Sequence, residues 1–267
     1  MNAGMKPDSL LQEQDAKLSG WREPVVRMQH AIERDELVLY CQTIAALAGP
    51  VRYPMAEVLV RLREEEAALM PPGEFLPVFE HFRMMPALDR WVVRGVVRHL
   101  AKGSRIPSFS INLSSQTLED AAFPASVAQA LMAGGVRGES LLFEIDEASL
   151  LAHPEAVERF GNAMNAIGCR LMIDGFGRRA VSFAPLKRLR VGYVKVDGVI
   201  VRKLLSSESA ERKLRAILRV AEATGFGVIA EMVEDQDILT RLKALGVSHA
   251  QGFGIHQPQP ISGFAAA

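Results

Sequence analysis

Short apolar runs alternate with longer amphipathic segments along most of the chain. The runs are rich in branched and aromatic residues, as buried strands are, and they lie at 37–47, 56–62, 108–114, 141–146, 170–174, 192–197, 228–233 and 249–255. The intervening segments repeat their apolar positions at helical spacing, and several end in glycine, the usual helix stop. They cover 23–37, 88–103, 124–135, 154–168, 209–225 and 235–246. This alternation predicts parallel strands covered by helices.

About eight strands in one domain favour a closed α/β barrel of the (β/α)8 TIM type over an open sheet. No glycine-rich phosphate loop follows the first run, which weakens the alternative of a doubly wound nucleotide-binding fold. Residues 1–20 are mostly polar, and we expect them to form a flexible tail. Residues 21–267 are then expected to form a single barrel domain.

Composition is that of an ordinary globular protein. The chain has 267 residues, 49% hydrophobic, with 31 basic and 31 acidic side chains. This balance gives no overall attraction to a nucleic acid polymer or to anionic lipid. Cys41 and Cys169 both lie in apolar runs, which indicates buried free thiols rather than a disulfide framework. The sequence has neither a signal-peptide pattern nor an apolar run of membrane-spanning length, so we expect a cytoplasmic protein.

Polar residues occur in seven of the apolar runs, and we interpret each as lying near the C-terminal end of its strand. In a parallel barrel these ends meet at one face, where barrel active sites lie. Charge in a strand interior is costly without a partner, so we expect the side chains to converge on one mouth. They are Glu57, Asn112, Glu144, Asp174, Lys195, Glu231 and Gln251.

The residue types indicate the chemistry of that mouth. Oxygen ligands of the kind that Mg²⁺ or Mn²⁺ prefers are offered by Glu57, Asn112, Glu144 and Asp174. Glu231 is a candidate general base, and Lys195 could hold the attacking water or offset phosphate charge. The set therefore indicates metal-assisted attack on a phosphodiester. Taken singly, each residue fits a polar or ion-paired position in a barrel interior at least equally well, for example Lys195 with Asp174. Four oxygen ligands together with Lys195 and Glu231 on one rim favour the metal-assisted chemistry.

Six segments in a definite order connect these residues to a known family. They read AEVL (56–59), SINLS (110–114), FEIDE (143–147), YVKVD (193–197), AEMVE (230–234) and QGFGIHQPQP (251–260). They resemble, in turn, the Glu-Ala-Leu, asparagine, Glu-x-Thr-Glu, Lys-Ile-Asp, Ala-Glu-Gly-Val-Glu and closing Gln-Gly motifs of the EAL-domain cyclic di-GMP phosphodiesterases. Val58 replaces the alanine of the first motif, and Asp146 replaces the threonine of the third. The resemblance extends over residues 25–262.

The resemblance implies a barrel in which one strand runs antiparallel and cyclic di-GMP binds at the mouth, giving linear pGpG when hydrolysed. It implies that a first Mg²⁺ or Mn²⁺ is held by Glu57, Asn112, Glu144 and Asp174. Lys195 and Glu231 would act as catalytic residues on the attacking water. Candidates for contacting the ligand are Arg61, Gln251 and Gln42, and Glu147 is the candidate anchor of the loop that follows Phe176.

The stretch LMIDGFG at 171–177 departs from the family pattern. The family has Asp-Asp-Phe-Gly, and Gly175 stands where the second aspartate would bind a second metal. We therefore expect one metal site to be retained and the second to be weakened or lost. Residues 178–182 read RRAVS in place of Thr-Gly-Tyr-Ser-Ser, the loop that couples the metal site to a dimer interface in the family. Arg178 and Arg179 either contact phosphate or a partner, or form a solvated loop tip.

Three hypotheses follow for the function. The first, which we favour, is a degenerate EAL domain that binds cyclic di-GMP, hydrolyses it weakly or not at all, and signals to an unknown protein partner. The second is an active Mg²⁺- or Mn²⁺-dependent phosphodiesterase that tolerates Gly175. The third is a protein-interaction scaffold without nucleotide. A homodimer is expected from the resemblance, although the altered loop changes the usual interface.

Overall fold

The computed structural model describes residues 23–63, 69–178 and 183–266. The expected tail at 1–20 and residues 179–182 of the altered loop lie outside the described residues. The strands form one continuous sheet that closes on itself, because β1 pairs with β2 as well as with β9. The barrel strands are β1 (Leu37–Ala46), β2 (Met55–Arg63), β4 (Ser108–Asn112), β5 (Leu141–Asp146), β6 (Arg170–Phe176), β7 (Val191–Val196), β8 (Gly227–Ala230) and β9 (His249–Ala250).

The direction of the strands confirms the predicted barrel and its antiparallel member. From β2 through β9 each strand runs parallel to its neighbour, whereas β1 runs antiparallel to both β2 and β9. Two short strands extend the sheet beyond the barrel: β3 (Leu69–Met70) beside β2 and β10 (Gln259–Pro260) beside β1. The chain is therefore an eight-stranded α/β barrel of the TIM type with its first strand reversed.

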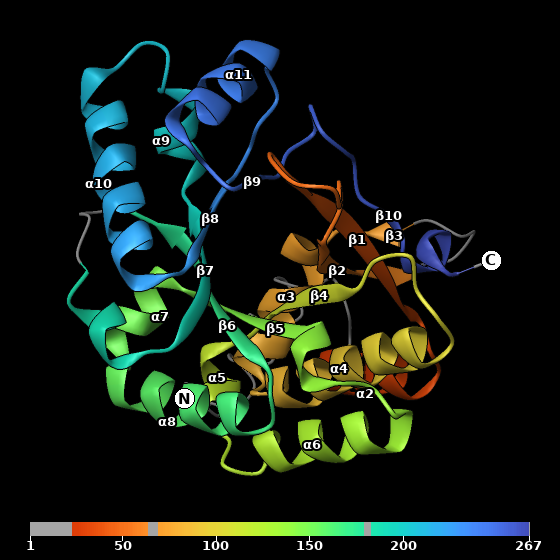
Figure 1. Ribbon diagram of the computed structural model, residues 1–267. Coiled ribbons are helices and arrows are strands. Elements are labelled where there is room, and N and C mark those ends of the chain that lie inside the picture. Colours follow the sequence, from red (N-terminus) through yellow and green to blue (C-terminus); the bar gives the residue numbers. More distant parts are fainter. Residues whose placement is uncertain (1–22, 64–68, 179–182, 267) are drawn as a thin grey trace, which may run out of the picture.

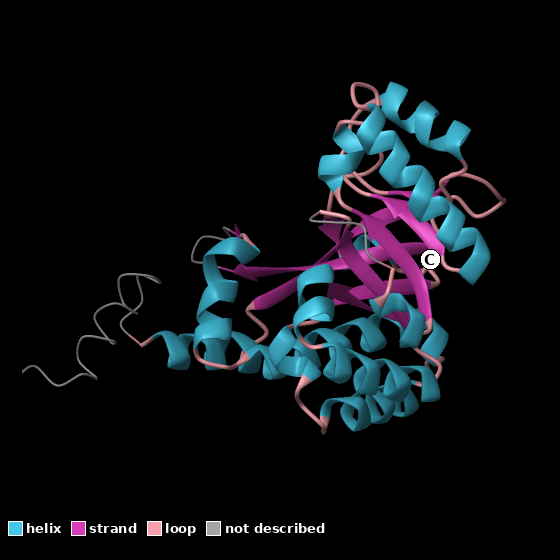
Figure 2. Cartoon of the chain, turned by 90° about the vertical axis from the view of Figure 1, so that its left-hand side faces the viewer, coloured by secondary structure: helices cyan, strands magenta, loops and turns pink. Residues whose placement is uncertain are grey.

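Helices surround the barrel (Figure 1). Turned by 90°, the molecule shows one group of helices below the strands and a second group, which includes α10 and α11, above them (Figure 2). The helices are α2 (Pro24–Glu33), α3 (Pro72–His81), α4 (Met85–Ala101), α5 (Ser115–Leu118), α6 (Phe123–Gly134), α7 (Glu147–Ala152), α8 (Pro154–Ala166), α9 (Gly198–Arg202), α10 (Glu208–Thr224) and α11 (Gln236–Leu245), with short 3-10 turns η2 (Gly138–Ser140), η3 (Pro185–Arg188) and η4 (Ile261–Phe264). None of the helices in the described part of the chain is long and apolar enough to cross a membrane.

Local signals in the sequence determine where the helices begin and end. Ser207 caps α10 by accepting a hydrogen bond from the Ala210 N–H, and Asp235 caps α11 in the same way. Such caps satisfy backbone donors that a helix start leaves open. Both helices stop at a glycine, as their sequences predict.

The apolar side chains form two separate clusters. The larger one fills the space between the outer face of the barrel and the helices, and it includes both cysteines, which are buried and free as predicted. The smaller one lies inside the barrel and consists of Ile44, Met55, Leu142, Met172 and Ile229, with Tyr193 against it. The inner cluster makes an apolar floor on which the polar residues of the mouth stand.

Candidate functional site

The alternation of side chains along each strand places the polar side chains in a layer next to the inner apolar cluster. Successive side chains on a strand point to opposite faces, so residues two apart share the barrel interior. The interior residues Met55, Leu142, Met172, Tyr193 and Ile229 are each followed two positions later by Glu57, Glu144, Asp174, Lys195 and Glu231 in turn. In this way one apolar layer and one charged layer are stacked within the barrel, as in other barrels of this class.

Lys195 lies at the centre of the charged layer. Its Nζ is 2.8 Å from Glu144 Oε2, 3.0 Å from Glu57 Oε2, 3.2 Å from Glu231 Oε1 and 3.3 Å from Asp174 Oδ1. The Lys195 side chain is only 2% exposed. Four carboxylates therefore converge on one buried ammonium, and the cluster carries more negative than positive charge.

Side-chain amides extend this network to the neighbouring strands. Glu57 accepts hydrogen bonds from Asn112 Nδ2 at 2.8 Å and from Gln251 Nε2 at 2.7 Å. Gln251 also donates to Gln42 Oε1 at 3.1 Å, and Gln42 in turn donates to the backbone oxygen of His256 at 2.7 Å. Asn112 and Gln251 thus hold Glu57 directly, and Gln42 holds Gln251 in turn.

The pKa values follow from burial and from this crowding of charge. Burial raises the pKa of Glu144 to about 8, and the charge of Glu57 adds to the rise. Burial also raises the pKa of Glu231 to about 8, with Lys195 opposing it and Asp174 adding to it. Burial would lower the pKa of Lys195, but the four carboxylates outweigh it and raise that pKa well above its ordinary value. For Glu57, Lys195 and the amide donors outweigh burial and lower the pKa.

The oxygen atoms of the cluster fit a divalent cation in their chemistry. Glu57, Asn112, Glu144 and Asp174 offer only oxygen ligands, as Mg²⁺ and Mn²⁺ require. In the described part of the chain, Glu144 Oε1 is buried without a hydrogen-bond partner, and buried Asp174 Oδ1 has only the ion pair with Lys195 at 3.3 Å. Nevertheless, no three His, Cys, Asp or Glu side chains of the described residues are grouped around one point as metal ligands. In this arrangement the positive charge that faces the carboxylates comes from the Lys195 ammonium.

The turn after β6 departs most from the expected pattern. Gly175 has a φ of 63°, and a Cβ built on it would meet only Asp197 Oδ2, at 3.9 Å. Glu147 Oε1 accepts a hydrogen bond from the Gly177 N–H at 3.0 Å, which is the position expected of a loop anchor. Arg178 donates through Nε to Asp197 Oδ2 at 2.7 Å. A side chain at position 175 therefore has room but must adopt a left-handed backbone, which aspartate tolerates better than most residues.

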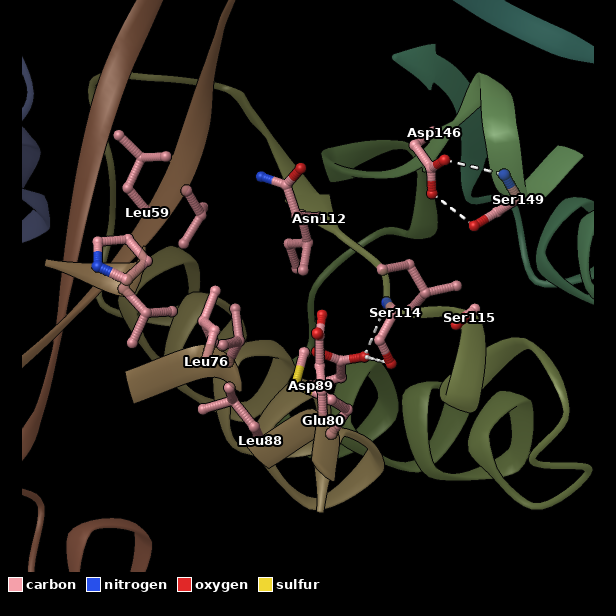
Figure 3. Close-up of a pocket in the computed structure, with 17 residues that line it drawn as sticks. Leu59, Leu76, Glu80, Leu88, Asp89, Asn112, Ser114, Ser115, Asp146 and Ser149 are labelled. Atoms are coloured by element: carbon pink, nitrogen blue, oxygen red, sulfur yellow. Dashed lines mark hydrogen bonds between the residues drawn. The ribbon is translucent and has the colours of Figure 1, made fainter. Parts of the chain in front are cut away.

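A pocket of about 380 Å³ lies beside the cluster, between β2, β4 and the helices α3 and α4 (Figure 3). Asn112 lines both the pocket and the cluster. Leu59, Leu76 and Leu88 form an apolar wall, and Asp89 lies beside Leu88 with its carboxylate bonded to Ser114. Burial raises the pKa of Asp89 to about 6, against hydrogen bonds from Thr117 and Ser114 that lower it. The pocket thus joins an apolar surface to hydrogen-bond acceptors.

The structure places most of the predicted residues together and corrects one position. Glu57 is the third residue of β2 and does not lie near its end, because β2 continues past the charged layer, paired with β1 as far as Leu62. Arg61 lies in this extension, with its guanidinium 5.6 Å from the centre of the Tyr40 ring. No hydrogen bond or ion pair joins Arg61 to the cluster within the described residues. Sequence reasoning missed Asp197, although it directly follows β7 as Glu231 follows β8 and Gln251 follows β9.

Comparison with known proteins gives one consistent result. Residues 25–258 match the family model described as EAL domain. The chain is 30% identical over 238 residues to the cyclic di-GMP phosphodiesterase PdeF of Escherichia coli, covering 88% of this chain and 32% of PdeF. It is also 30% identical to the cyclic di-GMP phosphodiesterase PdeB of Shewanella oneidensis, covering 90% of this chain and 28% of PdeB. The chain thus spans about a third of the length of these curated relatives.

Two solved structures share the fold. The structure of the PaMucR phosphodiesterase in complex with c-di-GMP superposes with a TM-score of 0.81 at 26% identity, covering 90% of this chain and 99% of that one. The FimX EAL domain from Pseudomonas aeruginosa bound to c-di-GMP superposes with a TM-score of 0.83 at 26% identity, covering 89% of this chain and 96% of that one. Both similar structures hold the nucleotide c-di-GMP.

Proposed function

The chain belongs to the EAL domain family, and from that premise we propose that it binds cyclic di-GMP at the mouth of the barrel and hydrolyses it weakly or not at all. The observation that carries this proposal is the gap at Gly175. Glu57, Asn112, Glu144 and Asp174 are all present at the mouth, whereas the position directly after Asp174 has no side chain to offer as a ligand. The chain would then act as a receptor for the second messenger and signal to a protein partner.

The mouth supports binding of a dinucleotide in two ways. The pocket beside Asn112 has room for a base, with leucine side chains to cover its face and the carboxylates of Glu80 and Asp89 to accept from its N–H groups. The charged layer next to it suits a phosphodiester when a divalent cation is held by Glu57, Asn112, Glu144 and Asp174. Such a cation would polarise a phosphate oxygen and favour ionisation of a bound water.

The remaining chemistry belongs to side chains of this chain. Glu231 has a pKa of about 8, close to neutral pH, and a general base is most effective when its pKa is near the working pH. Lys195 Nζ lies 3.2 Å from Glu231 Oε1 and stabilises its ionised form. In this proposal Glu231 accepts the proton of the attacking water, and Lys195 orients that water and offsets the developing charge. These two residues favour a second candidate function, an active phosphodiesterase that tolerates Gly175.

A turnover assay separates the two candidates. Purified protein is incubated with cyclic di-GMP and Mg²⁺, then with Mn²⁺, and pGpG is followed by chromatography, with Gly175→Asp measured in parallel. We expect slow or no turnover by the natural sequence and a gain of roughly 10²- to 10⁴-fold in the variant, the usual contribution of a well-placed catalytic group. Rapid turnover by the natural sequence would refute impaired activity and establish the second candidate. Failure of the natural sequence to bind the nucleotide would refute both.

A further inference from the structure

We propose that Arg178 binds a phosphate of the dinucleotide through its two terminal nitrogens, while its Nε is held by Asp197 at the mouth of the barrel. This inference rests on the proposed function, because it assigns a phosphate contact of the same site. It makes the first residue of the altered loop part of the ligand-binding surface. The neighbouring residues 179–182 have no part in it.

The charge of the mouth creates the need for such a residue. Four carboxylates surround a single lysine, so an anionic phosphodiester approaching the cluster meets an excess of negative charge. Lys195 cannot relieve this alone, because its side chain is 2% exposed and its ammonium already contacts all four carboxylates. A second cationic side chain with free donors beside the cluster would reduce this repulsion, in addition to the divalent cation of the proposed function.

Arg178 has the required geometry. Its Nε donates to Asp197 Oδ2 at 2.7 Å, and the Asp197 side chain is itself fixed, since it is 3% exposed and accepts the Val199 N–H at the start of α9. No other hydrogen bond of the Arg178 side chain occurs among the described residues. The guanidinium is a planar fork, so one edge held by Asp197 leaves the two terminal nitrogens free to bind two oxygens of a phosphate.

The guanidinium of Arg178 lies beside the cluster, because its partner Asp197 Oδ2 is 3.9 Å from the Cβ position of Gly175, the neighbour of Asp174. The Arg178 side chain is 69% exposed, so a ligand can reach it. Asp197 raises the pKa of Arg178 most, and the charges of Asp174 and Glu231 add to the rise, which indicates that the guanidinium lies within the field of the mouth. Gly175 keeps the intervening space open, because a Cβ there would meet only the Asp197 oxygen that Arg178 also contacts. Gly175, which lacks the carboxylate of the family pattern, and the guanidinium of Arg178 thus lie beside the same oxygen of Asp197.

Calorimetric titration with cyclic di-GMP tests the assignment on four forms of the protein: the natural sequence, Arg178→Ala, Arg178→Gln and Arg212→Ala. Arg178→Gln retains a donor for Asp197 without the charge. Arg212→Ala is the matched control, because Arg212 is 70% exposed and lies in α10, paired with Glu208. We expect both Arg178 variants to bind roughly 10- to 100-fold more weakly, the usual value of a charge-assisted hydrogen bond. The control should bind as the natural sequence does.

The outcomes distinguish the inference from the function on which it rests. If the natural sequence binds and Arg178→Ala binds equally well, the inference is overturned and the proposed function stands. If Arg178→Gln retains full affinity, the charge is not needed and the inference is likewise overturned. No binding by the natural sequence overturns the proposed function together with the inference. If Arg212→Ala weakens nucleotide binding as much as the Arg178 variants do, the loss of affinity comes from the change in net charge. The proposed contact between Arg178 and the phosphate is then overturned.

Discussion

Addition of Mg²⁺ or Mn²⁺ to the protein should release protons from the barrel mouth. Burial and neighbouring carboxylates raise the pKa of both Glu144 and Glu231 to about 8. Each of these groups therefore holds a proton through most of the neutral range when Lys195 is the main neighbouring cation. A divalent cation bound among the carboxylates favours their ionised forms, so its binding must be coupled to loss of these protons.

The expected number of protons follows from the two pKa values. With a pKa of about 8, each carboxyl group is roughly nine-tenths protonated at about pH 7 and one-tenth protonated at about pH 9. Binding of one cation that ionises both groups should then release more than about one proton at about pH 7 and far less at about pH 9. The affinity for the metal should rise with pH over the same interval.

Calorimetric titration with MgCl₂ or MnCl₂ in two buffers of different ionisation enthalpy measures this number directly. Glu144→Gln removes one of the two titrating groups, so the release at about pH 7 should fall by about half. Asp89→Asn is the control, because the pKa of Asp89 is about 6 and its carboxyl group is mostly ionised at that pH. Metal binding accompanied by less than about 0.3 protons, or an unchanged release in Glu144→Gln, would refute the reasoning.

Two further predictions concern stability. Burial raises the pKa of Asp89 from 3.8 to about 6, so the native state binds its proton more tightly than the unfolded state does. Its contribution is most favourable below about pH 4 and is lost as the pH rises through about 6, a change of about 3 kcal/mol. Urea unfolding at several pH values should show a flatter dependence over this range for Asp89→Asn, and parallel curves would contradict the prediction. Separately, a Cβ on Gly252 would lie 2.2 Å from the backbone oxygen of Val233 and 2.3 Å from its nitrogen. Gly252→Ala should therefore lower the free energy of unfolding by about 2–3 kcal/mol in urea, and a loss below about 0.5 kcal/mol would show that the backbone relaxes.

The strands and helices could be predicted from the sequence because they depend on interactions between residues that are close together in the chain. Period-two and helical spacing of apolar residues, together with capping residues such as Ser207 and Asp235, place most of the predicted elements within a few residues of their bounds. The run at 249–255 forms a strand only at His249–Ala250, and the helices α5, α7 and α9 were not among the predicted segments.

The polar residues of seven runs were also visible, since charge in an apolar strand is costly. Five of them, Glu57, Glu144, Asp174, Lys195 and Glu231, have an inward-facing apolar residue two positions earlier, a signal of their shared layer that the prediction did not use. Asn112 and Gln251 lack this signal, because Ser110 and His249 stand at those positions.

Other features depend on residues far apart in the chain. Glu57 was expected near the end of its strand, but the length of β2 is set by its pairing with β1, and this pairing carries the strand past the charged layer. The position of Arg61 away from the cluster has the same cause. The bond between Arg178 and Asp197 joins a turn after β6 to the start of α9, and neither partner carries a local mark of it.

The sequence by itself determined the alternation of strands and helices, the family resemblance and the replacement at Gly175. Each of these depends only on residue types and on the spacing of residues that lie close together in the chain. Only the tertiary structure decided that Lys195 contacts four carboxylates at once, that burial raises the pKa of Glu144 and Glu231, and that Arg178 Nε is bonded to Asp197 beside Gly175. Those properties arise from barrel closure, which brings side chains from separate strands within about 3 Å of one another in a buried space. Charge interactions and burial exist only at such distances, so they depend on the closed barrel and not on any one segment of the chain.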